Sequence, residues 1–361
     1  MNTRLVTVIG TRPNIVKAGP FLTALRRRPG IVNTLVHTGQ HYDADLSGNL
    51  QRELGLDSVD HNLDVGSGTH ATQVGTVLQR MEKPLLSARP AAVVVFGDVN
   101  STVAAAMAGA QLGVPVVHAE AGLRSGDDSI EELNRRQITR LAQLHLAPCR
   151  WSGLNLVAER IPSATVRTVG SLMACSALLY GRSGGEERLA ELDLVPGRYV
   201  VVTAHKESAV LDAAGVAALT TVLRKLSARI DVVFPLHPRT KRTLDRHVDP
   251  QDLERVRLVP PLGFRDMACL VRHAHAVLTD SDGLQDETTV HNVPCFTFAP
   301  ATARRTTVEV GTNTLVALTE PDLVDCILAA RPHGTPPRVP LWDEHVGERM
   351  VASMAEVILH G

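Results

Sequence analysis

Three carboxylates in the first half of the chain, Asp98, Glu120 and Glu131, have the chemical type and the placement of a proton-transfer set. Asp98 and Glu120 each follow a short apolar run, and Glu131 opens the segment EELNRR, which has the pattern of a helix start. Carboxylates that meet in a partly dry cleft raise one another's pKa, which makes a side chain a usable proton donor or acceptor near neutral pH. Spacing alone favours the simpler interpretation, in which Asp98 caps a helix and Glu131 and Glu132 are solvated helix charges.

Basic residues follow other apolar runs. Arg12 and Lys17 lie in GTRPNIVKAGP, at the start of the first predicted helix, where two cations could hold an anion or orient a carboxylate. His205 ends the run VVVTAH, a position that suits acid/base chemistry or ligand contact, although a histidine at a strand end is often structural. The chain contains no Walker A, G-x-G-x-x-G or H-E-x-x-H motif, so ATP hydrolysis, NAD chemistry and zinc protease chemistry have no support.

The segment AVLTDSDGLQDETT, residues 276–289, runs from a strand pattern through a polar turn into a helix pattern. The N-terminus of such a helix attracts an anion, because free N–H groups and the helix dipole point at it. Asp282 nevertheless places a carboxylate in this turn, and at about 4 Å it would repel a phosphate by roughly 4 kcal/mol at an effective dielectric constant of 20. Either Arg305 or Lys206 offsets that charge, or Asp282 is itself the N-cap of the helix and occupies the dipole site.

The elements that must position these residues are short apolar runs that alternate with amphipathic segments of helix length. The runs cover residues 5–10, 33–39, 91–98, 114–122, 144–149 and 166–171 and, after the polar stretch GRSGGEE, residues 199–205, 231–238, 256–262, 275–281 and 293–298. This spacing predicts parallel doubly wound sheets in two α/β domains of similar size. We place the domains at residues 1–172 and 185–344, with a final helix at 345–361 that packs back across the junction.

Polar side chains follow seven of these runs. In parallel α/β sheets, ligands bind beyond the carboxyl ends of the strands, so these side chains together predict one large polar cleft between two sheets. The groups are Gly10-Thr11-Arg12, Gly39-Gln40-His41, Gly97-Asp98, His118-Ala119-Glu120, His205-Lys206, His237-Pro238-Arg239 and Ser281-Asp282-Gly283.

The bulk composition is that of a globular protein. The chain has 361 residues, of which 44% are hydrophobic and 21% charged, so two domains with real cores are expected. Its formal net charge of -1 argues against binding nucleic acid through bulk charge. Five scattered cysteines without a C-x-x-C pair are typical of free thiols in a reducing compartment rather than a zinc site. With no signal-like segment and no apolar stretch approaching about 18 residues, we expect a cytoplasmic protein that does not enter the membrane.

The chain resembles the non-hydrolysing UDP-N-acetylglucosamine 2-epimerases over essentially its full length. The matching segments are GTRPNIVKAGP, HTGQHYD, VGSGTHATQ, VVVFGDVNSTVAAAMAGAQLGVPVVHAEAGLRSGD, EELNRRQITRLA, VVFPLHPRTK, LVPPLGF, VLTDSDGLQDETTVHNVPC and RTTVEVGTNTLV. The resemblance implies two Rossmann-like doubly wound domains in the GT-B arrangement, with a nucleotide sugar in the cleft between them. It also implies a homodimer that needs no cofactor, neither a metal nor NAD.

In that family the C2 proton of the sugar is removed, UDP departs from C1 by elimination, and the glycal takes UDP back while a proton arrives on the other face. The resemblance implies that Asp98, Glu120, Glu131 and His205 are the catalytic residues. It places Pro261 and Phe264 near the base, residues 281–283 around the diphosphate and Glu287 on the ribose hydroxyls. The full substrate-binding set implied in this way is Arg12, Lys17, Arg135, His237, Pro261, Phe264, Ser281, Asp282, Gly283, Glu287 and Arg304.

The chain departs from the family pattern mainly in its second domain. The family's S-G-G turn contains Asp282 here, its T-E-R-P segment is replaced at residues 302–305, and Lys206 stands where an arginine is usual. The intact acid/base set favours a nucleotide-sugar 2-epimerase. The alternative keeps that set but ends at elimination, as a lyase (dehydratase) on a nucleoside or nucleoside-like sugar that lacks the diphosphate. A third hypothesis, a non-catalytic binding protein, is opposed by the same intact set.

Overall fold

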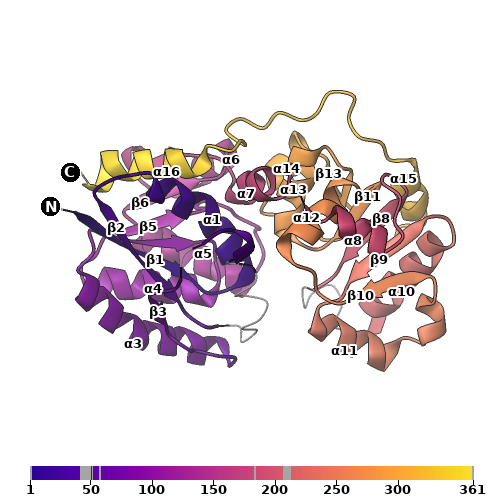
Figure 1. The fold of residues 1–361 in the computed structure, drawn as a ribbon, viewed down its shortest axis with the longest axis horizontal. Helices are drawn as coiled ribbons and strands as arrows, with labels where there is room; N and C mark the ends of the chain where they lie inside the picture. Colours follow the sequence, from indigo (N-terminus) through magenta and orange to yellow (C-terminus); the bar gives the residue numbers. More distant parts are fainter. Residues whose placement is uncertain are drawn as a thin grey trace. The chain divides into compact units, whose positions relative to one another are not determined.

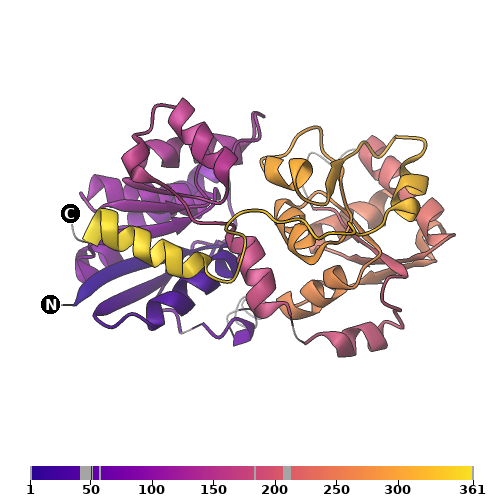
Figure 2. The same ribbon diagram turned by 90° about the horizontal axis from the view of Figure 1, so that it is seen from above.

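The computed structural model of the chain describes residues 2–40, 50, 52–56, 58–182, 184–205 and 213–359. Contacts divide the chain into two units: Met1–Leu179 together with Pro340–Gly361, and Tyr180–Val339. Each unit is a parallel sheet covered by helices (Figures 1 and 2). Within the described ranges, no helix combines the length and the apolar character needed to cross a bilayer.

The first unit has a seven-stranded sheet whose spatial order is β3-β2-β1-β4-β5-β6-β7. All neighbouring strands are parallel, and the chain reverses its direction of winding between β1 and β4. Ligand sites in doubly wound sheets lie beyond the strand ends at such a switch point. The strands are β1 Thr3–Ile9, β2 Ile31–His37, β3 His61–Asn62, β4 Ala92–Phe96, β5 Val116–Ala119, β6 Leu144–Ala147 and β7 Val166–Thr168.

The helices of the first unit begin at the edge of the sheet where the parallel strands end. Thr11 is the N-cap of the first helix, which has a proline in its first two positions, as proline's fixed φ allows. The side chains of Thr69 and Ser129 cap two further helices by accepting hydrogen bonds from backbone N–H groups. The helices are α1 Arg12–Arg26, α3 His70–Ala88, α4 Asn100–Gln111, α5 Ile130–Leu141, α6 Arg150–Ala158, α7 Leu172–Tyr180 and α16 Val346–Met354, with a 3₁₀ turn at Ser163–Thr165 and a π turn at Ala355–Leu359.

The second unit repeats this plan with a six-stranded parallel sheet in the order β10-β9-β8-β11-β12-β13. Its switch point lies between β8 and β11. The strands are β8 Tyr199–Thr203, β9 Asp231–Pro235, β10 Val256–Val259, β11 Ala276–Thr279, β12 Cys295–Thr297 and β13 Asn313–Leu315. The helices are α8 Glu186–Glu191, α10 Ala213–Ser227, α11 Pro238–His247, α12 Phe264–Arg272, α13 Asp282–His291, α14 Arg305–Glu309 and α15 Leu323–Ala329, with a 3₁₀ turn at Pro250–Leu253.

The central strands are mostly apolar because both faces of each sheet are covered. In β8, Val200 and Val202 belong to one core cluster, whereas Tyr199 and Val201 belong to a different one. Successive side chains of a strand point to opposite faces, so these two clusters fill the two sides of the same sheet. This burial is what makes a continuous apolar run the sequence signature of a strand here.

The end of the chain completes the first unit. Helix α16 packs so closely on α1 that a Cβ on Gly347 would lie 2.2 Å from the carbonyl oxygen of Pro20. The Trp342 Nε1–H donates to the Pro148 carbonyl at 2.9 Å, and Arg349 Nε donates to the Val169 carbonyl at 2.7 Å. Residues 340–354 are therefore part of the first unit's structure, and a glycine is required where the two helices meet.

The doubly wound α/β class predicted from the apolar runs is confirmed, and each predicted run overlaps an observed strand. Two strands were not predicted: β3, which pairs with β2, and β13, which pairs with β12. Both are short edge strands made mostly of polar residues, HN and NTL, so no apolar run marks them in the sequence.

Candidate active site

Lys17 brings a buried cation to the carboxyl end of β4. Its side chain comes from α1 and is only 8% exposed, and its Nζ lies 3.0 Å from the position that a Cβ on Gly97 would occupy. Gly97 has a φ of +66°, a conformation that glycine adopts without strain. Glycine at this position therefore leaves room for the ammonium group directly beside the residue that follows, Asp98.

Asp98 is held by an arginine and does not cap a helix. Arg135 Nε and NH2 lie 2.7 and 2.6 Å from Asp98 Oδ2, and Asn134 Nδ2 donates to the Asp98 carbonyl at 2.8 Å. The N-cap of α4 is Val99, so the simpler interpretation of Asp98 as a helix cap is wrong. The guanidinium keeps this carboxylate in one orientation while its side chain stays 20% exposed at the strand end.

Glu132 is the buried member of the acidic pair on α5, so the interpretation of this residue as a solvated helix charge is wrong. Its Oε2 accepts hydrogen bonds from the Ser125 N–H at 3.0 Å and from Arg135 NH1 at 3.2 Å, and its Oε1 accepts from Arg136 Nε at 3.1 Å. The predicted catalytic Glu131 is exposed on the first turn of the same helix. The signal for Glu132 was its spacing of three and four residues from two arginines, which places it beside both on a helix.

Glu120 has an unusual backbone at the end of β5. Its φ is +64°, a left-handed conformation that costs a residue with a side chain about 1–3 kcal/mol and that concentrates at functional sites. Its side chain is 3% exposed, and its Oε1 accepts a hydrogen bond from the N–H of Leu172 at 2.9 Å. Leu172 is the first residue of α7, so the N-terminus of that helix favours the charged form of the Glu120 carboxylate.

His118 supports the turn that carries Asp98. Burial lowers the pKa of its imidazole to about 3, so the ring is neutral at physiological pH. Its Nε2 lies 2.8 Å from the Gly97 carbonyl oxygen, which can only accept, so the ring hydrogen is on Nε2. The remaining predicted residue of this unit, Arg12, is half-buried at the first position of α1, beyond the end of β1.

In the second unit, His205 and Asp280 meet at the switch point between β8 and β11. The His205 backbone N–H donates to Asp280 Oδ2 at 2.7 Å, and the ring Nδ1 lies 2.9 Å from Asp280 Oδ1. The Asp280 side chain is 1% exposed, whereas that of His205 is 45% exposed. Asp280 was not among the predicted residues, although it directly follows an apolar run, the same signal that singled out Asp98.

Helix α13 begins beside this pair, and Asp282 is its first residue. The N-cap is Ser281, with extended φ and ψ of -81° and 126° and no hydrogen bond from its side chain to the helix. The interpretation of Asp282 as the N-cap is therefore wrong, because its backbone is already helical. Its carboxylate lies 3.4 Å from Gln285 Nε2 on the first turn, and Gly283 follows it.

The structure describes only one of the two cations expected to offset the negative charge of Asp282. Arg305 forms an ion pair with Glu309, one turn along α14. Lys206 lies outside the described residues.

Glu287 lies farther along α13 and is almost fully buried, with 5% exposure. Burial raises the pKa of its carboxyl to about 8, and the neighbouring charge of Asp286 contributes in the same direction. Asp286 itself is paired with Arg304, whose NH1 lies 2.9 Å from Asp286 Oδ2. The predicted ribose-binding carboxyl is thus neutral at pH 7 in this state, and the predicted Arg304 contacts another residue of α13.

The other predicted residues of this unit follow β9 and β10. His237 is exposed, and its carbonyl accepts the N–H of Lys241 in the first turn of α11. Pro261 is half-buried, and Phe264 is 7% exposed at the first position of α12. Because the strands are parallel, these residues share one sheet edge with His205 and Ser281. Each unit therefore gathers its own share of the predicted residues at the carboxyl ends of its strands.

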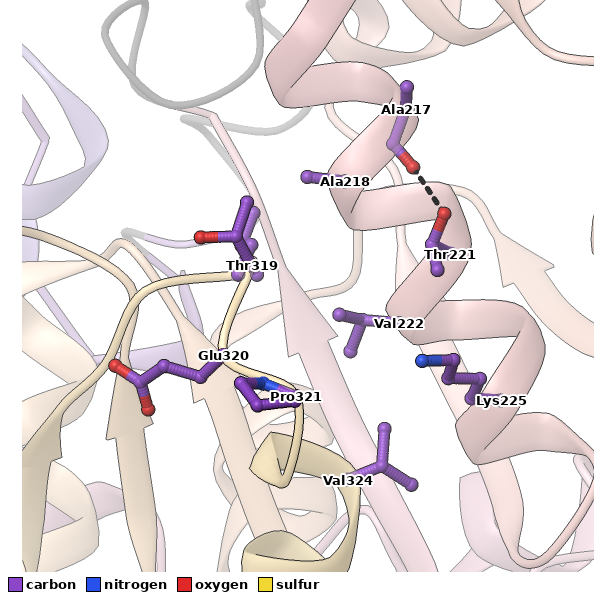
Figure 3. A pocket seen from close by; sticks show the side chains of 10 residues that line it. Ala217, Ala218, Thr221, Val222, Lys225, Thr319, Glu320, Pro321 and Val324 are labelled. Carbon is purple, nitrogen blue, oxygen red and sulfur yellow. Dashed lines mark hydrogen bonds between the residues drawn. The ribbon is translucent and has the colours of Figure 1, made fainter.

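A separate hollow of about 300 Å³ lies between α10 and the segment before α15 (Figure 3). Its floor is apolar, and Thr221 uses its hydroxyl to donate to the Ala217 carbonyl of its own helix at 2.8 Å. Glu320 points away from Lys225 in Figure 3 and accepts the Ala317 N–H at 2.7 Å. None of the predicted site residues lines this hollow.

Within the described parts of the chain, one group of side chains has the composition of a metal site: Glu186, Cys269 and His273, whose ligand atoms lie within 4.8 Å of one another. Arg272 donates to Glu186 Oε1 at 2.9 Å and to His273 Nε2 at 3.3 Å. A guanidinium therefore already uses the lone pairs that a metal would need.

Two doubly wound units, each with polar side chains and helix N-termini at the carboxyl edge of its sheet, are the architecture of a two-domain nucleotide-binding α/β protein. The chain matches the family described as UDP-N-acetylglucosamine 2-epimerase over residues 23–355, and it belongs to that family. The predicted family membership is confirmed.

Individual relatives cover nearly the whole chain. A UDP-2,3-diacetamido-2,3-dideoxy-D-glucuronate 2-epimerase of Pseudomonas aeruginosa is 33% identical over 327 residues, 89% of this chain and 90% of that protein. A UDP-N-acetylglucosamine 2-epimerase homolog of Methanococcus maripaludis is 32% identical over 344 residues, 91% of this chain and 93% of that protein. The crystal structure of Methanocaldococcus jannaschii UDP-GlcNAc 2-epimerase in complex with UDP-GlcNAc and UDP has a TM-score of 0.90 and 30% identity, covering 98% of this chain and 100% of that chain. The GT-B fold class with two Rossmann-like units is thereby confirmed.

Proposed function

We propose that this protein is a nucleotide-sugar 2-epimerase that acts on a UDP-GlcNAc-like substrate by elimination and re-addition. The observation that carries the proposal is the likeness, over 98% of the chain, to a UDP-GlcNAc 2-epimerase whose structure contains UDP-GlcNAc and UDP. Asp98, Glu120 and His205 of the family pattern stand at strand ends of this chain, and Glu131 lies on the first turn of α5, which supports the same chemistry here.

The first unit carries the carboxylates for the proton transfers. One carboxylate takes the C2 proton, the C–H electrons form the C1–C2 double bond, and the C1–O bond breaks with its electrons on the diphosphate oxygen. Re-addition reverses these steps, with a proton delivered to the opposite face of C2. Arg135 donates to Asp98 and the N–H of Leu172 donates to Glu120, and these contacts hold both carboxyl groups in place for the accepting role. Glu131 is the third candidate.

The second unit carries the groups for the nucleotide. The N-terminus of α13, residues 281–283, suits the diphosphate, and Glu287 suits the ribose hydroxyls, with Pro261 and Phe264 near the base. Asp282 weakens this anion site without capping the helix. The alternative of a lyase on a phosphate-free nucleoside drew its support from Asp282 as the N-cap, and that support is gone. The proposal includes a homodimer, which sedimentation of the purified protein would test.

Incubation with UDP-GlcNAc in D₂O tests the chemistry directly. We expect deuterium at C2 in both the gluco and the manno product, observed by proton NMR, because each turnover exchanges the C2 proton. Glu120→Gln should lose at least a hundredfold in exchange rate while it still binds UDP, since proton transfer by a positioned side chain contributes about 10²–10⁴-fold. Absence of exchange in a wild-type protein that binds no UDP would overturn the proposal.

A further inference from the structure

In the His205–Asp280 pair, a residue that was not among the predicted site residues contacts His205 at two points. One carboxylate holds His205 twice: Oδ2 accepts the backbone N–H at 2.7 Å and Oδ1 lies 2.9 Å from the ring Nδ1. Asp280 is 1% exposed, so water does not compete for these contacts. A side chain held at both its backbone and its ring keeps one orientation.

The pair also determines which ring nitrogen carries the hydrogen. Nδ1 lies 2.9 Å from a carboxylate oxygen that can only accept, and an unprotonated Nδ1 would set two lone pairs against each other at that distance, so we place the ring hydrogen on Nδ1. Nε2 is then the nitrogen left for a ligand. The His205 side chain is 45% exposed while its partner is buried, so the ring is the accessible part of the pair.

The location of the pair connects it to the anion site. Asp280 directly precedes Ser281, the N-cap of α13, and the Thr203 and Thr279 hydroxyls lie 2.6 Å apart where β8 and β11 run side by side. An anion bound at the first N–H groups of α13 would therefore lie next to the strand end that carries His205.

We propose that Asp280 is a positioning residue that fixes His205 with Nδ1–H toward the carboxylate and Nε2 toward the leaving diphosphate. This inference rests on the proposed epimerase function. For the reaction the ring carries a second hydrogen, on Nε2, while Nδ1 keeps its own toward Asp280. As the C1–O bond breaks and its electron pair moves to the diphosphate oxygen, Nε2 donates this second hydrogen to that oxygen. The ring is then neutral with its hydrogen on Nδ1, and Nε2 takes the second hydrogen back on re-addition.

Asp280→Asn tests the positioning because it moves the ring hydrogen of His205 from Nδ1 to Nε2. The His205 backbone N–H still needs an acceptor, so the oxygen of the introduced amide takes that place and the amide NH₂ faces Nδ1. Nδ1 must then accept, and the ring hydrogen moves to Nε2. We expect kcat to fall about 10²–10⁴-fold, as in other histidines whose carboxylate partner becomes an amide, with KM changed less than about threefold.

Nitrogen-15 NMR of histidine-labelled protein reads the tautomer without any reaction. The chain has 15 histidines, so the His205 signals are those that disappear in His205→Gln. At pH 8 we expect hydrogen on Nδ1 in the wild type and in the control Asp282→Asn, which makes the same charge change two residues away, and hydrogen on Nε2 in Asp280→Asn. A wild-type ring with hydrogen on Nε2 and none on Nδ1 would overturn the proposal, and so would an unchanged kcat in Asp280→Asn.

These outcomes separate the inference from the function on which it rests. A wild type that neither exchanges C2 nor converts UDP-GlcNAc contradicts the epimerase, whereas the wild-type tautomer still reports on Asp280. If Asp280→Asn fails to fold, the wild-type spectrum alone decides the positioning.

Discussion

Asp282 places a negative charge at the N-terminus of α13, where the helix would otherwise favour phosphate binding. As the first residue of α13 it interacts favourably with the helix N-terminus itself, so a diphosphate must share that position with a carboxylate. The side chain is half-exposed, so water and salt reduce the repulsion well below its value for a buried pair.

Asp282→Gly should therefore bind UDP more tightly than the wild type, by about tenfold, which corresponds to about 1.4 kcal/mol. Isothermal titration calorimetry at low and at physiological salt measures this, and the gain should shrink as salt rises. Asp282→Asn is the matched control, because it removes the charge and keeps the side chain. Equal UDP affinity in all three proteins would contradict a charge effect at this turn.

The raised pKa of Glu287 predicts how the free energy of unfolding depends on pH. Its pKa is raised from 4.5 to about 8 in the folded state, so the folded chain holds a proton that the unfolded chain has lost. The stabilisation from the neutral carboxyl is fully present below pH 4.5 and disappears as pH rises through about 8. From about pH 5 to about pH 8.5 the wild type should lose up to about 4 kcal/mol of unfolding free energy relative to Glu287→Gln, which does not titrate. Denaturant melts at several pH values measure this, and parallel curves for the two proteins would contradict a raised pKa.

At the scale of elements, a helix N-terminus and a catalytic candidate hold each other. The first N–H of α7 binds Glu120, while the Ser171 hydroxyl accepts the Ala174 N–H at 3.2 Å in the same first turn. The two oxygens thus satisfy different orphan donors of one helix. This contact ties the orientation of Glu120 to the position of α7, beyond the strand that carries it.

Leu172→Pro removes this donor without breaking the helix, since proline is tolerated at the first helical position. Leu172→Ala is the matched control, because it loses the same buried side chain but keeps the N–H. We expect Leu172→Pro to lose roughly tenfold more in kcat than Leu172→Ala, because hydrogen bonds to charged groups contribute about 1.5–3 kcal/mol. Steady-state kinetics with circular dichroism as a folding check measures the difference. Identical kcat values in the two variants would mean that the N–H does not orient Glu120.

At the scale of the whole molecule, the two units differ in how the chain builds them. The unit at residues 180–339 is continuous in sequence and contains both of its core clusters. The other unit needs the chain end, because Trp342, Val346, Met350 and Met354 are buried in it.

A fragment of residues 180–339 should therefore unfold cooperatively by itself. A fragment of residues 1–179 should not, because the face of α1 that α16 covers would be exposed, and it should regain cooperativity when residues 340–361 are attached through a flexible linker. Differential scanning calorimetry of the three proteins measures this. A cooperative transition in fragment 1–179 alone, at the temperature of the linked version, would show that the chain end is dispensable for that unit.

Local sequence patterns were sufficient to predict most of the fold. The strands β4 and β8 are buried on both faces, so each appears in the sequence as an unbroken apolar segment. Helix starts such as that of α5 show a capping serine. The edge strands β3 and β13 were missed because their residues are mostly polar and form no apolar run. The family resemblance added the residues of the site, which spacing alone had left open.

What the sequence by itself determined were the strand ends and the residue types standing there, since periodicity and residue chemistry are local properties of the chain. Only the tertiary structure decided which partner each side chain has. It buried Glu132 and exposed Glu131, paired Asp280 with His205 across 75 residues, and made Ser281 rather than Asp282 the N-cap. These outcomes depend on which strands lie side by side and on the helix phase to within one residue. Both are set by packing of the whole unit, which no local pattern contains.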